Sequence, residues 1–308
     1  MARHRRQAVR HGYIIVDKPA GWTSHDVVAR VRRLVGERRV GHAGTLDPAA
    51  VGVLPVAVGL ATRTVEYLAD SSKAYRAWIT FGITTDSADR DGMITSISDP
   101  SNLSLDVISA ALDVFQGEIF QRPPMHSAIK VEGKRLYELA RSGVEIDVEP
   151  RPVTIHDLRI VDWTSPVLCI DVECSKGTYI RSLARDLGAA VETGAHLSHL
   201  VRTRSGPFDI SNAVTLNELE HLLAQMTWDQ VAYHPDWSMQ HLTALVLGPE
   251  QAIDWGHGKP VCLDTLDDLT SIIRAYDAQG RWLGAGDYDP AAGTVKPVKV
   301  IPTELQSS

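Results

Sequence analysis

The chain has 308 residues, of which 44% are hydrophobic and 22% charged, and this composition is typical of a globular protein with a full core. The longest uncharged apolar run, 51–62, is too short to cross a bilayer, and charged residues directly follow the first apolar stretch, which argues against a signal peptide. Three cysteines without metal-ligand spacing indicate a reducing compartment. We therefore expect a cytoplasmic protein with no membrane partner.

The charge is unevenly distributed along the chain. The formal total is −7, yet residues 1–40 hold ten Lys and Arg against three acids, a local +7 that leaves −14 for the remainder. Such a basic end predicts a localised anionic partner, for example one arm of a nucleic acid, and argues against general polyanion binding. Residues 1–11 are equally typical of a solvated basic tail. The arginines at 30–39, on a predicted helix and its exit, are stronger candidates for contact.

The first half of the chain alternates predicted strands and helices. Thr23 or Ser24 can cap a helix whose valines and leucine keep one face over 27–35. Ser104 can cap another helix, which Gly117 would end. The remaining predicted elements are a buried strand at 13–16, a buried strand at 53–58, a helix at 61–68 and a half-buried strand at 73–81.

The second half contains a segment of different character. Residues 121–143 begin with two prolines and carry several basic side chains, which is typical of a projecting basic element rather than of core. The other predicted elements are a strand at 168–174, a helix after Gly177, a helix capped by the Thr215–Glu218 capping box and ending near Met226, a linker at 227–239 and a glycine-rich small all-β module at 242–301.

This order of elements predicts the fold class. Strands and helices are interleaved without a regular βαβ period, and the loops are rich in Gly and Pro. We therefore expect an α+β fold with a mixed, mainly antiparallel central sheet flanked by helices and loops. The main domain is assigned to 12–232, with the projecting element 121–143 inside it, and the small C-terminal module to 240–308.

Residues 41–48 (Gly-His-Ala-Gly-Thr-Leu-Asp-Pro) are the most informative segment. They place the carboxylate of Asp47 between an apolar residue and a proline, with His42 five residues upstream. A partly desolvated and poorly paired carboxylate is costly unless it has a task. Taken alone, however, an Asp-Pro pair is also a common turn.

Three further residues have both a structural and a chemical interpretation. Tyr75 and Tyr179 occupy positions where most tyrosines are core residues with a bonded hydroxyl. Arg181 falls in the first turn of its predicted helix, where the helix dipole disfavours a cation. It therefore needs an anionic partner, for which Asp47 is the natural candidate. The pair is either a structural ion pair or a catalytic carboxylate oriented by arginine.

Other chemistries lack their motifs. No His or Cys cluster has metal-ligand spacing, and no phosphate-binding loop, dinucleotide-binding glycine motif or serine-hydrolase elbow is present in the sequence. An enzyme built on this chain is therefore expected to work with side chains alone, without metal or cofactor.

Five motifs in one order carry a family resemblance. They are 17–25 (Asp-Lys-Pro-Ala-Gly-Trp-Thr-Ser-His), the octet ending in Asp47-Pro48, Lys73-Ala74-Tyr75, Pro123-Pro124 with Ser127-Ala128-x-Lys130, and Gly177-Thr178-Tyr179-Ile180-Arg181. Over about residues 12–210 the chain resembles the TruB family of pseudouridine synthases, bacterial enzymes that modify the uridine at position 55 of the tRNA T-loop.

The resemblance implies a pseudouridine synthase fold, a C-terminal PUA-like module and a role for each matching residue. Asp47 would be the nucleophile, attacking the uracil ring or the ribose anomeric carbon, and Tyr75 would stack on the flipped uracil and serve as candidate final base. The other implied roles are Arg181 pairing the aspartate, Tyr179 and Leu200 lining the pocket, His42 filling the space of the flipped base, and Lys18, Arg63 and Lys130 contacting RNA. The partner would be the T-arm stem-loop of tRNA, bound by a monomer without guide RNA.

The sequence departs from the family pattern in three places. His126 stands where relatives usually have Tyr, and Arg63 stands where many have Lys. The C-terminal module is acidic, which allows at most a weak contact with an RNA backbone.

Two other functions were weighed. A tRNA-binding folding helper would have no use for a costly partly buried carboxylate, and the related guide-RNA-dependent enzymes normally carry a larger, more basic C-terminal part. Isomerisation of uridine in tRNA is therefore the leading hypothesis.

Overall fold

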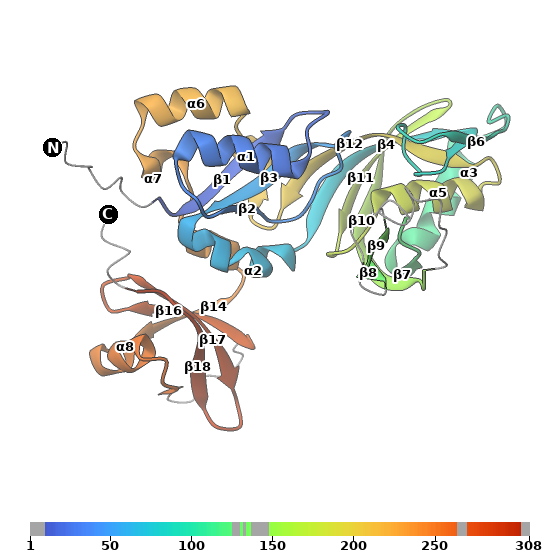
Figure 1. Cartoon of the computed structure of the whole chain (residues 1–308). Helices are drawn as coiled ribbons and strands as arrows, with labels where there is room; N and C mark the ends of the chain where they lie inside the picture. Colours follow the sequence, from blue (N-terminus) through green and yellow to red (C-terminus); the bar gives the residue numbers. More distant parts are fainter. Residues whose placement is uncertain (1–9, 125–129, 132–133, 137–147, 264–269, 303–308) are drawn as a thin grey trace.

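The computed structural model describes residues 10–124, 130–131, 134–136, 148–263 and 270–302. Across these residues, a nine-stranded mixed sheet flanked by helices occupies the upper part of Figure 1, and a five-stranded module lies below α2. The predicted α+β class is confirmed. No helix in the same ranges is long and apolar enough to cross a membrane.

The large sheet consists of two antiparallel halves. The short strands β2 (Val40–His42) and β13 (Phe208–Asp209) pair with β3 and β12. The halves are joined where β12 runs parallel to β3 through the pairs Val201–Val51 and Arg202–Gly52. The spatial order is β1 (Gly12–Lys18), β3 (Val51–Val58), β12 (Ala195–Ser205), β4 (Lys73–Phe81), β11 (Val167–Cys174), β10 (Arg151–Thr164) and β7 (Gly117–Gln121).

Helices α1 (Ser24–Val35) and α6 (Leu216–Gln225) cover one half of the sheet. The Thr23 side chain caps α1 in a capping box with Asp26, and Gly36 ends the helix in the left-handed conformation. The predicted valine face is buried against β1 and β3. The same hydrophobic periodicity that defined α1 in the sequence therefore fixes its orientation.

Helices α3 (Leu105–Leu112) and α5 (Ile180–Ala190) cover the other half. Their buried residues pack with apolar side chains of β4, β11 and β10, among them Phe81 and Ile170. The first turn of α5 follows the loop from β11, with Tyr179 directly before it, and its Arg181 lies beside Asp47. This packing brings the segment 177–181 toward the octet 41–48.

Three predicted element boundaries differ from the structure. The expected helix at 61–68 divides into η1 (Gly59–Arg63) and α2 (Val65–Ala69). Thr64 lies between them in a non-helical conformation, and its hydroxyl bonds the Ala61 carbonyl and the Tyr13 hydroxyl. After α3 a short η2 (Asp113–Phe115) follows, and Gly117 begins β7 rather than ending a helix.

The segment 227–239 is not the simple linker that its sequence suggested. It contains α7 (Trp228–Val231) and η4 (Pro235–Met239), and the Met239 side chain is fully buried. Met239 packs with Leu60, Tyr67, Trp282 and Ile301, so that η1 and α2 are joined to the C-terminal module through one hydrophobic cluster.

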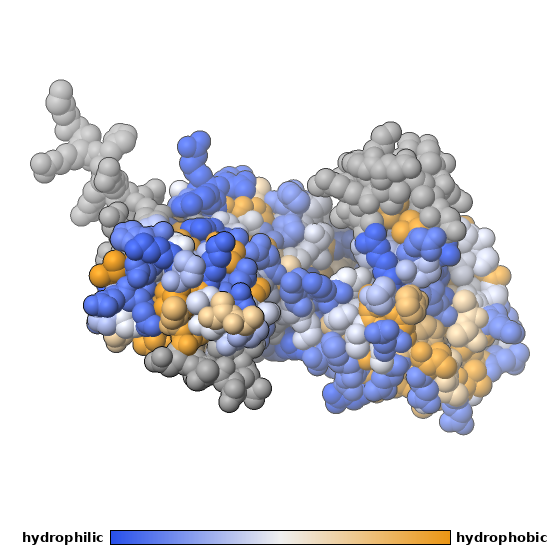
Figure 2. Space-filling view, turned by 90° about the horizontal axis from the view of Figure 1, so that it is seen from below, coloured by the Kyte–Doolittle hydropathy of each residue, from blue (hydrophilic) through white to orange (hydrophobic). Residues whose placement is uncertain are grey.

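The C-terminal module contains a helix that the all-β interpretation missed, α8 (Pro249–Gly256). Its fully buried Trp255 forms the centre of the module's core. The module's sheet has the order β14 (Thr243–Leu247), β16 (Ile272–Asp277), β17 (Trp282–Asp289), β18 (Thr294–Val300) and β15 (Val261–Cys262). Seen from below, hydrophilic residues interrupted by hydrophobic patches cover the molecule (Figure 2).

Candidate active site

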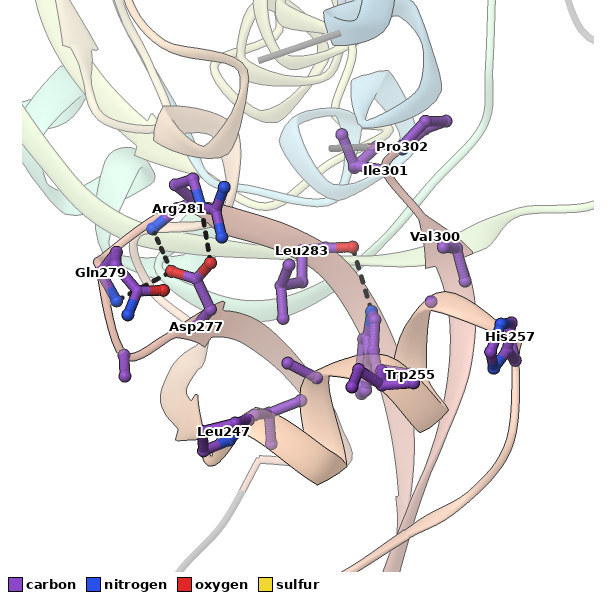
Figure 3. Close-up of a pocket in the computed structure, with 15 residues that line it drawn as sticks. Leu247, Trp255, His257, Asp277, Gln279, Arg281, Leu283, Val300, Ile301 and Pro302 are labelled. Atoms are coloured by element: carbon purple, nitrogen blue, oxygen red, sulfur yellow. Dashed lines mark hydrogen bonds and ion pairs between the residues drawn. The ribbon is translucent and has the colours of Figure 1, made fainter. Parts of the chain in front are cut away.

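One cavity, of about 530 Å³, lies within the C-terminal module beside α8 (Figure 3). Two pairs in its lining are already made: the Asp277 carboxylate accepts from Arg281 Nε at 2.6 Å, and the Trp255 indole donates to the Leu283 carbonyl at 3.0 Å. It contains none of the candidate residues predicted from the sequence.

Another cavity, of about 1090 Å³, lies where the two halves of the large sheet meet. It brings together six of the nine predicted site residues, which come from segments far apart in the sequence. These are His42, Asp47, Tyr75, Tyr179, Arg181 and Leu200. This cavity is the candidate active site.

The octet 41–48 forms a pinned turn at the cavity wall. The Ser24 hydroxyl hydrogen-bonds both the amide and the carbonyl of Leu46, at 3.0 and 3.1 Å. The Ala50 amide donates to the Asp47 carbonyl at 3.1 Å, so the Asp-Pro pair does open a turn. The structural and chemical interpretations of Asp47 are therefore compatible, because the turn presents the carboxylate to the cavity.

Arg181 forms the ion pair with Asp47 that its position in the sequence indicated. Its Nε lies 3.1 Å from Asp47 Oδ2; the arginine side chain is 5% exposed, whereas the Asp47 side chain is 45% exposed toward the cavity. Protein atoms around the carboxylate raise the pKa of Asp47 by desolvation, and the Arg181 charge opposes that shift. The carboxylate is thus accessible to a ligand while held by a buried guanidinium.

Asp89 is a site residue that the sequence interpretation missed. Its Oδ2 lies 3.4 Å from Arg181 Nη1, so Arg181 bridges two carboxylates. The Ser87 hydroxyl and the Asp91 amide donate to the other Asp89 oxygen at 2.6 and 3.1 Å. No spacing in the sequence links residue 89 to residue 47 or 181; only the fold brings them together.

Tyr75 lines the cavity from β4, where it is the register partner of the fully buried Arg202 on the neighbouring strand β12. Burial raises the pKa of Tyr75, and the Arg202 charge works against that shift. Arg202 was not identified from the sequence, where no strand was predicted at its position.

Tyr179 is held by Gln121, the last residue of β7. The Tyr179 amide donates to Gln121 Oε1 at 2.7 Å, and Gln121 Nε2 donates to the Tyr179 carbonyl at 2.9 Å. The Gln121 side chain is buried, so its amide takes the place of a side-chain cap at the start of α5. The strand that leads into the segment 121–143 is thereby attached to the helix that carries Arg181.

His42 and Leu200 complete the lining. Burial, with the charges of His25 and Arg202, lowers the pKa of His42 to about 4, so the ring is neutral at physiological pH. Its Nδ1 has no hydrogen-bond partner within the described part of the chain, and its ring meets His25 edge-on at 5.4 Å. Leu200 packs its apolar side chain against the core beneath the cavity.

The position of Lys18 differs from the one expected. It was expected to contact the RNA backbone, but its side chain is fully buried. Its ammonium donates to the carbonyls of Pro19, Trp22 and Pro48 at 2.9, 2.6 and 3.1 Å. A buried group cannot meet a phosphate, so Lys18 instead ties the segment 17–25 to the end of the octet.

Arg63 and Lys130 do not line the cavity. Arg63 Nη1 donates to the Val300 carbonyl at 2.9 Å, which places the guanidinium at the junction with the C-terminal module. Lys130 begins the short strand β8 (Lys130–Val131), paired with β9 (Lys134–Arg135). His126 and the Lys130 side chain lie outside what the structure describes. Within the described ranges, no cluster of His, Cys, Asp and Glu could hold a metal ion.

Comparisons with known proteins identify the class and then the family. The model of the TruB family pseudouridylate synthase N-terminal domain matches residues 32–180, and that of the tRNA pseudouridylate synthase B C-terminal domain matches 181–254. These matches define a pseudouridine synthase. A crystal structure of a Cbf5-Nop10-Gar1 complex contains a similar chain, with TM-score 0.76 and 26% identity, covering 98% of this chain and 88% of the other.

Sequence similarity extends over nearly the whole chain. The tRNA pseudouridine synthase B of Gloeobacter violaceus is 45% identical over 296 residues, covering 95% of this chain and 99% of its own. That of Symbiobacterium thermophilum is 56% identical over 224 residues, covering 71% and 75%. The chain belongs to the TruB family of pseudouridine synthases.

Proposed function

We propose that this protein converts uridine to pseudouridine at position 55 of the tRNA T-loop, with Asp47 as nucleophile and without cofactor or guide RNA. Pseudouridine formation in tRNA follows from the family and from relatives named tRNA pseudouridine synthase B. The observation that carries the choice of nucleophile is the Asp47–Arg181 pair, 3.1 Å apart and open to a cavity of about 1090 Å³.

The reaction is an isomerisation that side chains alone can perform. The uridine must leave the base stack, because a carboxylate on a cavity wall cannot reach a stacked nucleotide. Asp47 then forms a bond to uracil C6 or to the ribose anomeric carbon, and the glycosidic C–N bond breaks. After the base has turned, C5 bonds to the anomeric carbon and Asp47 is released. The proton on C5 leaves, and N1, which has lost its bond to the ribose, takes up a proton. No atom is gained or lost overall.

The walls of the cavity suit these steps. Tyr75 offers a ring for stacking and a hydroxyl near the reacting carbons, while Tyr179 and Leu200 provide further apolar surface. The neutral ring of His42 can occupy the place of the flipped base without burying a charge. Arg181 keeps Asp47 ionised and oriented for attack.

Binding would rest on the shape and phosphates of the T-arm rather than on a long sequence. The segment 121–143, with Lys130, is the proposed RNA-binding element. It is basic, and β7, which leads into it, is attached to α5. The protein would act as a monomer in the cytosol.

The test is proton release from uracil C5 in an unmodified tRNA transcript carrying tritium at that carbon. The wild type should release one equivalent per tRNA, whereas Asp47→Asn should release none, and a transcript with cytidine at position 55 should yield no product at that site. Asp70→Asn is a matched control, since this exposed carboxylate pairs with Lys176 outside the cavity. Full turnover by Asp47→Asn would refute the nucleophile, and release from the cytidine transcript would refute the site.

A further inference from the structure

Arg202 is a buried cation without an acidic partner. Its side chain is 1% exposed, and no carboxylate among the described residues lies within ion-pairing distance. Two residues further along β12, Arg204 pairs with Glu173 at the surface. Burying an unpaired guanidinium is expensive. A neutral side chain would fill the same space at lower cost, so a specific task must offset the burial of this charge.

The guanidinium donates its hydrogen bonds to backbone carbonyls. Nε donates to the Val53 carbonyl at 2.7 Å, and Nη2 donates to the Gly44 carbonyl at 3.0 Å. A longer contact of 3.4 Å joins Nη1 to the Thr45 carbonyl. One side chain thus ties β3 to the octet, from a position that is paired in register with Tyr75 of β4.

Two glycines lie beside Arg202. Gly44 and Gly52 have φ values of +92° and +98°, which favour glycine. A Cβ on Gly52 would lie 2.3 Å from the backbone carbonyl of Arg202, so Gly52 allows β3 and β12 to approach closely at this point. A Cβ on Gly44 would lie 3.5 Å from Arg202 Nη1, so the guanidinium reaches to van der Waals distance of this glycine.

The contacts of Arg202 connect the two groups that face the substrate. The carbonyls of residues 44 and 45 come three and two residues before Asp47, in the turn that presents its carboxylate. Across β12 and β4, Arg202 is paired in register with Tyr75, and both residues line the cavity. We propose that Arg202 is a positioning residue for pseudouridine formation, holding the Asp47 loop and the Tyr75 hydroxyl in one fixed relation. This inference rests on the proposed function and adds a residue to it.

Arg202→Met should lower the single-turnover rate on tRNA by about 100-fold, because this is the effect expected when reacting groups move by about 1 Å. The KM for tRNA should change by less than about 3-fold. Arg202→Lys keeps the charge but has a single donor nitrogen and cannot reach all three carbonyls, so its rate should lie between those of the wild type and Arg202→Met. Arg204→Met, two positions along the same strand, should retain the wild-type rate.

A double-mutant cycle with Tyr75→Phe separates positioning from general stability. If Arg202 acts through the phenol, Arg202→Met should lower the single-turnover rate by a smaller factor in the Tyr75→Phe background than in the wild type. Thermal unfolding would first establish that each variant is folded; if Arg202→Met is not, the cycle is run with Arg202→Lys. A folded Arg202 variant with the wild-type rate, or an additive cycle, would overturn the inference. An inactive wild type would instead refute the proposed function.

Discussion

At the scale of single residues, the cavity contains a row of alternating charges: Asp47, Arg181 and Asp89. The first carboxylate is open to the cavity, the guanidinium is buried, and the second carboxylate is held by the Ser87 hydroxyl and the Asp91 amide. The outer end of the row is therefore free to react, while the inner end is fixed. Asp89 sets the direction of Arg181 without facing the substrate as openly as Asp47.

This row predicts that two variants shift the acid limb of the pH–rate profile in opposite directions. In the proposed mechanism Asp47 reacts as a carboxylate. Burial raises its pKa, so kcat/KM should fall as the pH drops through that raised value. Arg181→Gln removes the neighbouring positive charge and should move this acid limb to higher pH by about one unit or more. Asp89→Asn removes a negative charge and should move it to lower pH.

Tritium release measured from about pH 4 to about pH 8 would show the acid limb of the wild type and of both variants. Asp171→Asn, whose carboxylate pairs with Arg76 outside the cavity, should leave the limb in place. If Arg181→Gln and Asp89→Asn shifted the limb in the same direction, Asp47 would not be the titrating group.

Lys18 predicts an effect on stability. Lys18→Met deprives three carbonyls of their buried donor and should lower the free energy of unfolding by about 2 kcal/mol. Burial lowers the pKa of Lys18 to about 8, from 10.5 in the unfolded chain, so between these values the unfolded state binds more protons and stability rises with pH. The difference between wild type and variant should therefore widen over this pH range. Urea unfolding at its two ends measures it, and a narrowing gap would contradict the sign.

The sequence indicated some of these residues and not others for a physical reason. Arg181 could be paired with Asp47 because a cation in a first helical turn requires an anion. Asp89 and Arg202 obtain their partners only from long-range contacts, which leave no local pattern. Lys18 was assigned to RNA contact through the family resemblance. In the structure its ammonium instead donates to the carbonyls of Pro19, Trp22 and Pro48, and no pattern in the sequence indicates that set.

At the scale of elements, the attachment of β7 to α5 is the most consequential contact. Gln121→Leu would leave the amide and carbonyl of Tyr179 without their partner in a buried position. We expect a loss of about 1–3 kcal/mol of stability. We also expect a lower kcat on tRNA, because the first turn of α5 carries Arg181.

The exposed Glu118 of the same strand provides the control, since Glu118→Leu leaves these hydrogen bonds intact. Equal unfolding midpoints and rates for Gln121→Leu and Glu118→Leu would show that the Gln121 amide does not hold the helix.

Elements with a strong period or cap were predicted well, and those defined by tertiary contact were not. The helix over 24–35 and the strand over 73–81 follow from local patterns, which the structure confirms. The long strands β10 and β12 were not anticipated, although β12 is central, because their polar faces obscure the alternation. The interruption at Thr64 depends on a hydrogen bond to Tyr13, fifty-one residues away.

At the scale of the whole molecule, the C-terminal module is joined to η1 and α2 by a buried cluster. Met239 lies at its centre with no exposed surface, so Met239→Ala should cost about 2–5 kcal/mol of unfolding free energy. Met226, 40% exposed at the end of α6, is a matched control whose replacement should cost less than about 0.5 kcal/mol. Denaturant unfolding compares the two. Equal losses of unfolding free energy in the two variants would show that the buried cluster at the junction does not stabilise the protein.

The place where the two family models meet has a consequence for how such a chain can be recombined. The first match ends at Ile180 and the second begins at Arg181, so Asp47, Tyr75 and Tyr179 belong to one segment while Arg181 and Arg202 belong to the other. In space these side chains share one cavity. An exchange of either segment between distant relatives would replace half of a single charge arrangement. The two matched segments therefore contribute to one site, although separate family models match them.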